Sequence, residues 1–277
     1  MRILITGGSG FLGTALSLKL IARGDTVCIF SRDEVKHAKM IREFGNHPNM
    51  RWFLGDVRDG ARLSRAMRGC DAVVHAAALK RIETGHANPS EMVATNIIGT
   101  QNAIDAAADN KVSRFVFVSS DKAYQPISPY GQSKALAESL TLNANHVYGE
   151  RGPAYRCVRY GNVSGSTGSI IPLWRTWLRD GDTVPVTDPN CTRFWMPADE
   201  AVAFVLRSVD EPFVPDLAIP ELPAFTVGDL AEAMGAKMNI IGLPAWEKVH
   251  ESMGDGNCSA DAKRMSVEDL REALKSV

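Results

Sequence analysis

The chain begins with a short apolar segment that runs directly into a glycine-rich turn. Residues 2–6 have the composition of a buried strand, and Gly7, Gly10 and Gly13 follow with the spacing G-x-x-G-x-x-G. Residues 14–23 are then expected to form a helix. Glycines at this spacing let the backbone turn tightly and approach a pyrophosphate, which rests at the helix N-terminus. The pattern predicts a nucleotide-binding strand–turn–helix unit, and an ordinary glycine turn is the alternative.

The following sequence alternates between apolar strands and amphipathic helices. Strands are expected at residues 26–30, 51–54, 71–75, 114–118 and 154–160. Longer helices are expected at residues 91–110 and 130–148, and shorter ones at 202–209, 227–234 and 267–275. Such alternation is typical of a parallel sheet that is covered on both faces. We therefore predict an α/β fold, with a Rossmann-type doubly wound parallel sheet and a small C-terminal substrate-binding lobe.

The composition of the sequence changes after Asn162, where glycines and prolines interrupt the alternation of strands and helices. We expect residues 1–162 to form an NADP-binding Rossmann domain and residues 163–277 to form mainly the substrate-binding lobe. Within the second part, residues about 194–210 are predicted to pack back on the Rossmann domain.

Composition excludes several classes of function. The net charge of −1 gives no electrostatic reason to expect nucleic acid or an anionic membrane surface as a partner. No apolar run approaches membrane-spanning length. The five cysteines are scattered without a C-x-x-C motif, which argues against a disulfide framework or a metal site and fits a reducing compartment. Because Met1 leads straight into the first strand, we expect no signal peptide and a cytoplasmic location.

Two polar signatures follow the strand at residues 114–118. Asp121 and Lys122 place an acid beside an amine at the strand end, and Tyr130 and Lys134 lie one helical turn apart. A lysine ammonium beside a phenol favours the phenolate and lowers the pKa of the phenol. Such a phenol can take a proton from a sugar hydroxyl while hydride leaves the same carbon. Together the pairs predict an oxidation followed by an acid–base step; a surface helix pair and a surface ion pair are the alternatives.

Cofactor choice is set at the end of the second strand, which reaches Ser31 and Arg32. An acidic residue there would bind the ribose hydroxyl of NAD. A hydroxyl and a guanidinium suit a 2′-phosphate instead, so the sequence favours NADP. In the competing interpretation Arg32 is solvated and Asp33 binds the ribose.

These motifs resemble those of the extended short-chain dehydrogenase/reductase superfamily. Within it, the chain is similar to the inverting UDP-N-acetylglucosamine 4,6-dehydratases, which open the pseudaminic acid and related bacterial sugar pathways. The similarity runs from Arg2 to about Glu251 and is carried by residues 30–34, 55–59, 75–80, 95–96, 120–123, 159–163 and 192–196. By the same resemblance, dehydratases that retain the configuration at carbon 5 have Asp-Glu where this chain has Asp121-Lys122, and simple epimerases usually have neither.

The resemblance implies a role for each member of the two pairs. Tyr130 would deprotonate the 4-hydroxyl while NADP⁺ takes hydride from carbon 4, and Lys134 would orient the nicotinamide ribose and tune Tyr130. A desolvated Lys122 would remove the proton on carbon 5. Asp121, protonated, would give its proton to the departing 6-hydroxyl. Hydride would return to carbon 6, and reprotonation would fix the configuration at carbon 5.

Further site residues are assigned by position and resemblance. Besides Tyr130 and Lys134, the cofactor contacts are expected from Thr6, Gly7, Gly10, Phe11, Leu12, Gly13, Ser31, Arg32, Asp56, Val57, Ala76, Ala77, Ala78, Lys80, Asn96, Ser119, Tyr160, Asn162 and Val163. The UDP-sugar is expected to contact Lys80, Ser120, Asn162, Arg193 and Glu251. Arg193 would clamp the diphosphate, unless it is a surface arginine beside Trp195. The chain lacks two arginines that are common in the group, after the Asn162-Val163 motif and before Glu247.

The expected product is a 4-keto-6-deoxy sugar with possible inversion at carbon 5. A UDP-sugar 4-epimerase, a dehydratase with a different unsaturated product and a non-catalytic NADP-binding sensor are the competing interpretations. Relatives in the superfamily pair through the helices around the Tyr-x-x-x-Lys segment. We therefore expect a homo-oligomer in which the alanine-rich residues 103–108 pack closely between subunits.

Overall fold

A seven-stranded parallel sheet forms the centre of the protein. The structure, a computed structural model, describes residues 1–211 and 216–277. The strands follow the order β10-β6-β5-β4-β1-β2-β3. Their bounds are β1 (Arg2–Thr6), β2 (Thr26–Ser31), β3 (Met50–Leu54), β4 (Ala72–His75), β5 (Arg114–Val118), β6 (Ala154–Val158) and β10 (Leu217–Ala218). The chain order reverses between β1 and β4, and ligands of such sheets bind outside the carboxyl ends of the strands at this point.

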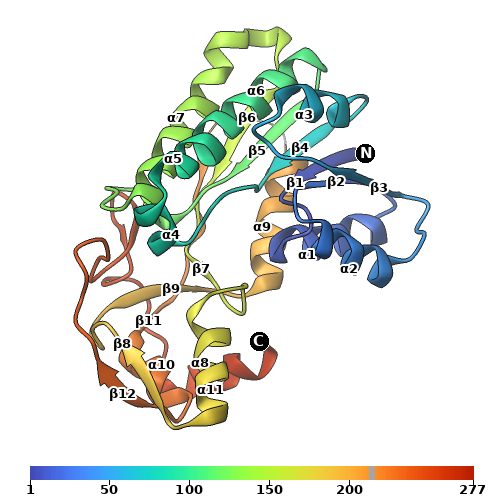
Figure 1. The fold of residues 1–277 in the computed structure, drawn as a ribbon. Coiled ribbons are helices and arrows are strands. Elements are labelled where there is room, and N and C mark those ends of the chain that lie inside the picture. Colours follow the sequence, from blue (N-terminus) through green and yellow to red (C-terminus); the bar gives the residue numbers. More distant parts are fainter. Residues whose placement is uncertain (212–215) are drawn as a thin grey trace.

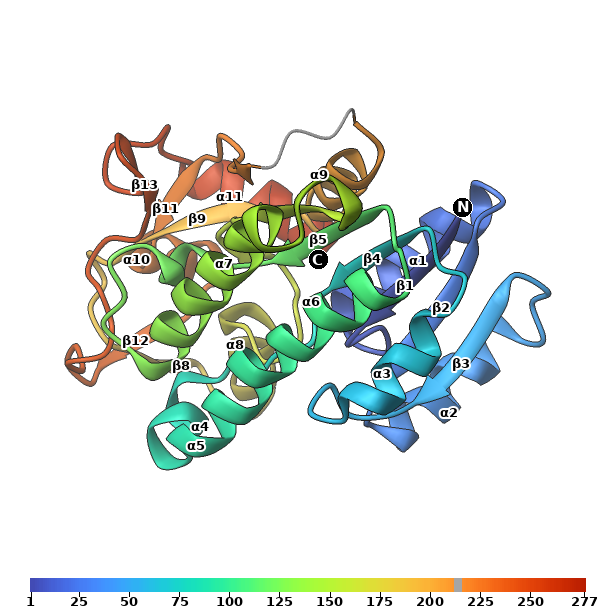
Figure 2. The same cartoon turned by 90° about the horizontal axis from the view of Figure 1, so that it is seen from above.

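Helices cover both faces of this sheet, as Figures 1 and 2 show. One face packs against α1 (Phe11–Ala22), α2 (Glu34–Phe44) and α9 (Ala198–Asp210). The other face packs against α3 (Gly60–Met67), α6 (Gly99–Asp109) and α7 (Pro129–Tyr148). Because β1 is buried from both sides, Ile3, Leu4 and Ile5 are fully inaccessible to solvent. The predicted Rossmann-type parallel sheet is confirmed.

The expected helix at residues 91–110 is divided into three parts. It consists of α5 (Pro89–Met92), the π-helical turn η1 (Val93–Ile98) and α6. The wide turn holds Asn96, whose amide bonds both backbone groups of Leu79 at 2.8 and 2.9 Å and the Ser133 hydroxyl at 2.9 Å. A local interruption of this kind often marks a functional region of a helix.

The alanine-rich stretch of α6 lies inside the subunit, and the expectation that it packs between subunits is wrong. Ala103, Ala106 and Ala107 are at most 3 % exposed and belong to the core under α3 and α7. Small side chains let these neighbouring helices approach each other within one chain.

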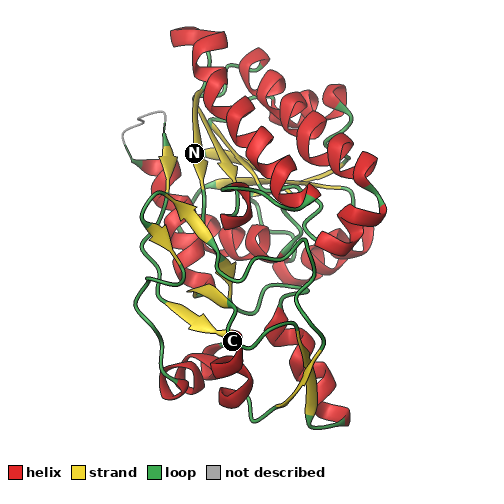
Figure 3. Ribbon diagram, turned by 90° about the vertical axis from the view of Figure 1, so that its left-hand side faces the viewer, coloured by secondary structure: helices red, strands yellow, loops and turns green. Residues whose placement is uncertain are grey.

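The second lobe carries short strands and helices, which lie below the main sheet in Figures 1 and 3. One sheet contains β7 (Asn162–Val163), β9 (Thr192–Met196) and β11 (Ala224–Thr226), and two strand pairs join β8 (Thr183–Val186) to β12 (Lys237–Ile240) and β13 (Ser252–Gly254) to β14 (Asn257–Cys258). The helices are α8 (Ile170–Asp180), α10 (Val227–Ala233) and α11 (Val267–Ala273). Trp174, Phe225 and Leu230 lie in the core between them.

Several helices of the structure were not predicted from the sequence. Helix α8 contains Pro172, which suggested a break, but a proline in the first helical turn costs no intrahelical hydrogen bond. Helices α2 and α3 are short and begin at the side-chain caps Asp33 and Asp59. The segment α4 (Ile82–Ala87) was also not expected.

The division of the chain at residue 162 stays a prediction. Two later segments return to the main sheet: β10 pairs with β6, and α9 packs against α1. Among the helices of residues 1–211 and 216–277, none combines the length and the apolar character needed to cross a membrane.

Candidate active site

The site is built on the turn that follows β5. Ser120 caps the short 3-10 helix η2 (Asp121–Ala123), because its Oγ accepts the backbone N–H of Lys122 at 3.3 Å. The same hydroxyl donates to Asp121 Oδ1 at 2.7 Å. The backbone N–H of Asp121 donates to the carbonyl of Tyr160 at 3.0 Å, and its side chain is 2 % exposed. The turn therefore holds a carboxylate rigidly at the carboxyl edge of the sheet.

A glycine lets α7 approach this turn closely. A Cβ built at Gly131 would lie 2.3 Å from the carbonyl oxygen of Lys122, which is closer than any side chain can come without a shift. Ser128 caps α7 by accepting the Gly131 N–H at 3.1 Å. The preceding residue, Tyr130, is thereby buried beside the turn. The two signatures predicted from the sequence lie next to each other in space.

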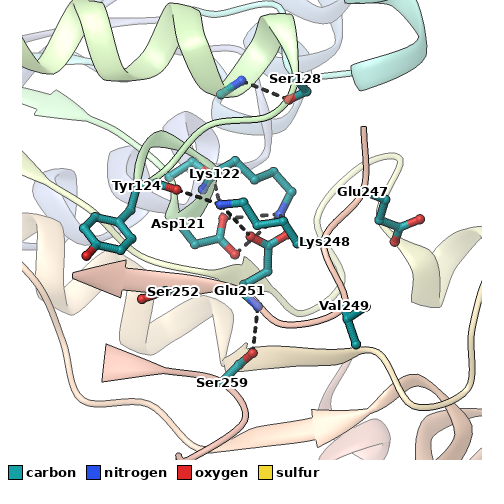
Figure 4. A network of polar contacts seen from close by, with 12 residues as sticks. Asp121, Lys122, Tyr124, Ser128, Glu247, Lys248, Val249, Glu251, Ser252 and Ser259 are labelled. Carbon is teal, nitrogen blue, oxygen red and sulfur yellow. Dashed lines mark hydrogen bonds and ion pairs between the residues drawn. The ribbon is translucent and has the colours of Figure 1, made fainter. Parts of the chain in front are cut away.

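Lys122 is held between two carboxylates from distant parts of the chain (Figure 4). Its Nζ lies 3.3 Å from Asp121 Oδ1 and 3.4 Å from Glu251 Oε1. The backbone N–H of Glu251 donates to the Ser259 hydroxyl at 2.9 Å. Lys248 Nζ lies 3.8 Å from the other Glu251 oxygen and donates to the Tyr124 carbonyl at 2.6 Å.

The ion pairs decide the charge of Lys122. Burial lowers the pKa of Lys122, but the carboxylates of Asp121 and Glu251 outweigh burial, so the pKa is raised. The expected desolvation of Lys122 is present, but in the free protein the two carboxylates favour its ammonium form. A proton has to leave Lys122 before the side chain can act as a base.

The cation that acts on Tyr130 is also different from the expected one. The pKa of Tyr130 is raised in the free protein, because burial outweighs the Ser120 side chain and the charge of Lys122, which lower it. The lowered pKa expected from the sequence is therefore wrong for the free protein. Lys134 instead donates to the Val118 carbonyl at 2.6 Å and lies 4.2 Å from the centre of the Phe117 ring. Burial lowers the pKa of Lys134 to about 8. In the free protein Lys122, rather than Lys134, favours the Tyr130 phenolate.

The glycine turn after β1 fits a dinucleotide. Gly7 has a φ of 65°, and a Cβ there would lie 3.0 Å from the backbone of Ala77. A Cβ at Gly13 would lie 2.4 Å from the carbonyl oxygen of Gly8, so only glycine allows α1 to begin this close to the strand. The Thr6 hydroxyl accepts the backbone N–H groups of residues 76 and 77, both at 3.2 Å. A phosphate can therefore approach the backbone at the start of α1.

The residues at the end of β2 have distinct partners. Ser31 Oγ lies 2.6 Å from Ser9 Oγ, and the half-exposed Arg32 guanidinium lies 3.6 Å from Asp56 Oδ2. The Asp33 carboxylate caps α2 by accepting the Lys36 N–H at 3.0 Å, and it pairs with Lys36 Nζ at 3.1 Å. The Asp33 carboxylate is thus engaged in capping α2. The Arg32 guanidinium makes only the longer contact with Asp56 and is more available to bind a cofactor phosphate.

A cavity of about 320 Å³ lies between the catalytic turn and the second lobe. Lys122, Asn162, Arg193 and Glu251 line it together with Trp174 and other apolar side chains of the lobe. Asn162 Oδ1, and Ser119 Oγ near the turn, are buried without a hydrogen-bond partner among the described residues. A buried polar atom of this kind is ordinarily satisfied by a ligand or water.

Arg193 is buried rather than exposed beside Trp195. Its guanidinium bonds Glu247 Oε1 at 2.6 Å and the carbonyls of Thr192 and Val249 at 2.7 and 3.1 Å. The predicted diphosphate clamp is therefore paired in the free protein, and a substrate phosphate would have to compete with Glu247.

The remaining predicted residues take different positions. Asn96 uses its amide for protein contacts and is 1 % exposed, which suits a positioning role better than a direct cofactor contact. Lys80 is exposed at the end of the loop after β4. The residues at strand ends and at the start of α1 lie along the carboxyl edge of the sheet: Phe11, Leu12, Gly10, Val57, Ala76, Ala78, Tyr160 and Val163.

Sequence reasoning missed Lys248 and Glu247 as parts of the site. Both line the cavity, and each pairs with a residue that had been predicted. Their position three and four residues before Glu251 was the available signal.

Comparison with known proteins decides the family. A family described as "Polysaccharide biosynthesis protein" matches residues 3–269. The chain belongs to this family.

Curated proteins are similar to this chain over most of its length. A UDP-N-acetylglucosamine 4,6-dehydratase (inverting) of Campylobacter jejuni is 41 % identical over 257 residues, 91 % of this chain and 77 % of the relative. A UDP-glucose 4-epimerase of Rickettsia conorii is 36 % identical over 282 residues, 98 % of this chain and 81 % of the relative.

Solved structures agree with the fold. The X-ray structure of Pen from Bacillus thuringiensis is 31 % identical with a TM-score of 0.95, and the match covers 99 % of this chain and 96 % of that one. The dTDP-glucose 4,6-dehydratase DesIV of Streptomyces venezuelae, crystallised with NAD, is 25 % identical with a TM-score of 0.86 over the same shares of the chains.

Proposed function

We propose that the protein is an NADP-dependent sugar-nucleotide 4,6-dehydratase that acts on UDP-N-acetylglucosamine or a close relative. The observation that carries the proposal is the contact between a buried acid, Asp121, and an amine, Lys122, beside the buried phenol of Tyr130. The printed activity of the Campylobacter jejuni relative supports it. The product would be a 4-keto-6-deoxy sugar, with possible inversion at carbon 5.

The first half of the reaction uses Tyr130 as the base. In its phenolate form Tyr130 takes the proton of the 4-hydroxyl, and the positive charge of Lys122 favours that phenolate. A nicotinamide dinucleotide held at the glycine turn after β1 would supply the hydride chemistry at carbons 4 and 6. Lys134, which donates to the Val118 carbonyl, would orient the nicotinamide ribose.

The second half uses the ion pair on the catalytic turn. A 4-ketone acidifies the proton on carbon 5, so a base and an acid are then needed on neighbouring carbons. Transfer of one proton from Lys122 to Asp121, across 3.3 Å, makes both at once. Lys122 then takes the carbon 5 proton, and Asp121 gives its proton to the leaving 6-hydroxyl. Glu251 stabilises Lys122 again as it becomes an ammonium.

The residues at the end of β2 support NADP as the cofactor. Arg32 presents a guanidinium beside the first turn of α2, and Asp33 is engaged as the cap of that helix. A 2′-phosphate would gain a charge-assisted contact with Arg32, whereas the ribose hydroxyl of NAD would lack a free carboxylate here. The structurally similar DesIV was crystallised with NAD, so the choice has to be measured.

The substrate is proposed to lie in the cavity beside Lys122. Asn162 and Arg193 would contact the sugar nucleotide from the inner wall, and Lys80 would approach from the loop after β4. Glu247, which pairs with Arg193, and Lys248, which pairs with Glu251, would then change partners as the diphosphate binds.

A UDP-sugar 4-epimerase is the second candidate, because the Rickettsia conorii relative carries that name. An epimerase needs the phenol and the cofactor but no acid–base pair for carbons 5 and 6. The Asp121 and Lys122 pair, buried against Glu251, favours dehydration.

We also propose a homo-oligomer that forms through α6 and α7. These helices lie side by side on one face of the sheet. Leu136 of α7 is 47 % exposed, and Ile98, which directly precedes α6, is 50 % exposed. Light scattering of the purified protein tests this, and a monomer at micromolar concentration would contradict it.

Product analysis tests the proposed reaction. The purified protein, with NADP, is incubated with UDP-N-acetylglucosamine, and the nucleotide sugars are analysed by mass spectrometry. The proposal predicts a product lighter by one water molecule, which Lys122→Ala abolishes while NADP binding remains. A product of unchanged mass with inverted carbon 4 would establish the epimerase instead.

A further inference from the structure

Arg159, the residue that follows β6, is a buried cation in contact with three separate segments of the chain. It is 8 % exposed, and its guanidinium binds both carboxylate oxygens of Glu138 on α7, with Nε 2.9 Å from Oε1. Its Nη1 donates to the backbone carbonyl of Met253 in β13 at 2.7 Å. The centre of the Tyr124 ring lies 5.8 Å from the guanidinium carbon. One side chain therefore joins α7, β13 and the residue that follows η2.

Two contacts at this point of the chain hold the segments of the carboxylates that flank Lys122. Met253 follows Glu251 by two residues, so the bond to the Met253 carbonyl limits where the Glu251 carboxylate can lie. The next carbonyl after the arginine, that of Tyr160, accepts the backbone N–H of Asp121 at 3.0 Å. The end of β6 is therefore a common anchor for both carboxylates.

The other bonds of the Glu251 segment have a different effect. The backbone N–H of Glu251 donates to the Ser259 hydroxyl at 2.9 Å, and the backbone N–H of Ser259 donates to the Glu251 carbonyl at 2.8 Å. Ser259 belongs to the second lobe, so these bonds fix Glu251 within that lobe. The bond from Arg159 to Met253 ties the same segment to a strand of the main sheet.

The chemistry of the Arg159 and Glu138 pair suits a role in geometry more than in stability. A buried ion pair contributes little stability beyond that of apolar side chains of similar size, because both groups lose their hydration. The planar guanidinium can, however, bind a carboxylate and a carbonyl at the same time in fixed directions. An apolar side chain could fill the space but could not hold β13 in this way.

We propose that Arg159 is a positioning residue for the dehydration: through the Met253 carbonyl it holds the Glu251 carboxylate against Lys122. The inference rests on the proposed function, because that function gives Lys122 its role at carbon 5. Arg159 acts through Glu251 and does not itself contact the reacting atoms.

The pH at which Lys122 is acylated in the free protein reports on this arrangement. Burial lowers the pKa of Lys122, and the carboxylates of Asp121 and Glu251 raise it, with further contributions from Arg193 and Tyr130. When Glu251 moves away, the ammonium loses one of its two carboxylates, and acylation should begin at a lower pH.

Two variants remove the tie to the Met253 carbonyl. The double variant Glu138→Met/Arg159→Met replaces the whole ion pair, because Arg159→Met alone would leave a buried carboxylate without its cation. Arg159→Lys keeps a positive charge beside Glu138 but lacks the planar fork that reaches both partners. We expect acylation of Lys122 to begin about one pH unit lower in the double variant, and lower by a smaller amount in Arg159→Lys.

The sign of the change separates positioning from a simple charge effect. Loss of the Arg159 charge cannot lower the pKa of Lys122, because removal of a cation favours an ammonium. The matched control is Glu138→Gln, which keeps Arg159 and its bond to the Met253 carbonyl, and in which acylation should begin at the wild-type pH. Circular dichroism verifies the fold of each variant, and Arg159→Lys alone decides the question if the double variant is unfolded.

Turnover provides a second measurement. In Arg159→Lys, product formation should fall by about tenfold, and reduced nicotinamide should accumulate, because oxidation at carbon 4 continues while removal of the carbon 5 proton is slowed. A loss of turnover without such accumulation would contradict the inference.

The outcomes for this inference and for the proposed function can be told apart. If acylation of Lys122 begins at the wild-type pH or higher in the folded variants, or falls equally in Glu138→Gln, Arg159 does not position Glu251. These titrations use the free protein, so that result leaves the proposed function intact. If wild type releases no water from UDP-N-acetylglucosamine, the proposed function is wrong, and Arg159 loses its role in that reaction whatever the titrations show.

Discussion

Lys122 Nζ lies 3.4 Å from Glu251 Oε1, although 129 positions separate the two residues in the chain. The contact joins the catalytic turn after β5 to the segment that precedes β13, so the second lobe supplies part of the electrostatic environment of the Rossmann-type sheet. Glu251 is 2 % exposed, and such a carboxylate is stable only when a cation is near it.

Replacement of Glu251 by Gln should lower the pKa of Lys122. Asp121 and Glu251 both raise that pKa in the wild type, so the loss of one negative charge destabilises the ammonium. The pH dependence of Lys122 acylation, followed by peptide mass spectrometry with the exposed Lys111 as reference, measures the change. Modification of Lys122 should begin at lower pH in Glu251→Gln.

The matched control is Asp255→Asn, which changes a nearby carboxylate that bonds the Tyr124 hydroxyl instead of Lys122. In this variant, acylation of Lys122 should begin at the same pH as in wild type. If acylation of Lys122 began at the same pH in wild type and in Glu251→Gln, the side chains of Lys122 and Glu251 would not pair in solution.

Gly131→Ala should separate Tyr130 from the catalytic turn. The new Cβ would lie 2.3 Å from the Lys122 carbonyl oxygen, so the turn or the start of α7 has to move. We expect a loss of about 1–3 kcal/mol in the free energy of unfolding and a larger relative loss of turnover. Urea denaturation and product formation measure the two effects.

Gly60→Ala provides the comparison, because a Cβ there would meet its nearest atom at 3.4 Å, an ordinary contact. Wild-type turnover in Gly131→Ala would mean that the close approach does not position the phenol.

Lys134 predicts a pH dependence of stability. Burial lowers its pKa to about 8 from 10.5, so between these values the unfolded chain binds a proton that the native state lacks. Unfolding then takes up a proton, and the free energy of unfolding contributed by this group rises with pH. Between pH values below 8 and above 10, the free energy of unfolding of wild type should rise by roughly 3 kcal/mol relative to that of Lys134→Met. Parallel urea titrations measure this difference, and a constant difference would place Lys134 in a hydrated environment.

Arg32→Ala should change cofactor preference. A charge-assisted contact with a 2′-phosphate is worth about 1.5–3 kcal/mol, so NADP should bind roughly tenfold to 100-fold more weakly while NAD is little affected. Fluorescence titration with each cofactor measures the ratio of affinities. Arg58→Ala is the control, because Arg58 pairs with the same Asp56 carboxylate but follows β3 and also pairs with Glu91. Equal losses for both cofactors would contradict the assignment of NADP.

The part of this site that could be predicted from the sequence is local. The strand before Gly7, the Tyr130 and Lys134 spacing and the acid–amine pair each depend on residues within one element, and the structure places them at one edge of the sheet. The family resemblance supplied the remaining assignments.

The charge state of the site depends on long-range contacts that a single sequence does not encode visibly. Nothing near Lys122 in the sequence indicates that the Glu251 carboxylate will approach it, so the second carboxylate that favours the Lys122 ammonium was not expected. Similarly, the alanines of α6 suggested a subunit contact because their burial under α3 was not visible in the sequence. Helix α8 was not predicted because Pro172 was taken as a helix breaker, whereas a proline in the first turn of a helix does not interrupt it.

Deuterium incorporation tests the central claim most directly. Wild-type protein with NADP is incubated with UDP-N-acetylglucosamine in deuterated water, and the product is analysed by nuclear magnetic resonance and mass spectrometry. The account predicts loss of one water molecule with deuterium at carbon 5, where Lys122 exchanges its proton with solvent. A product that keeps its oxygen and shows protium at carbon 5 would contradict it.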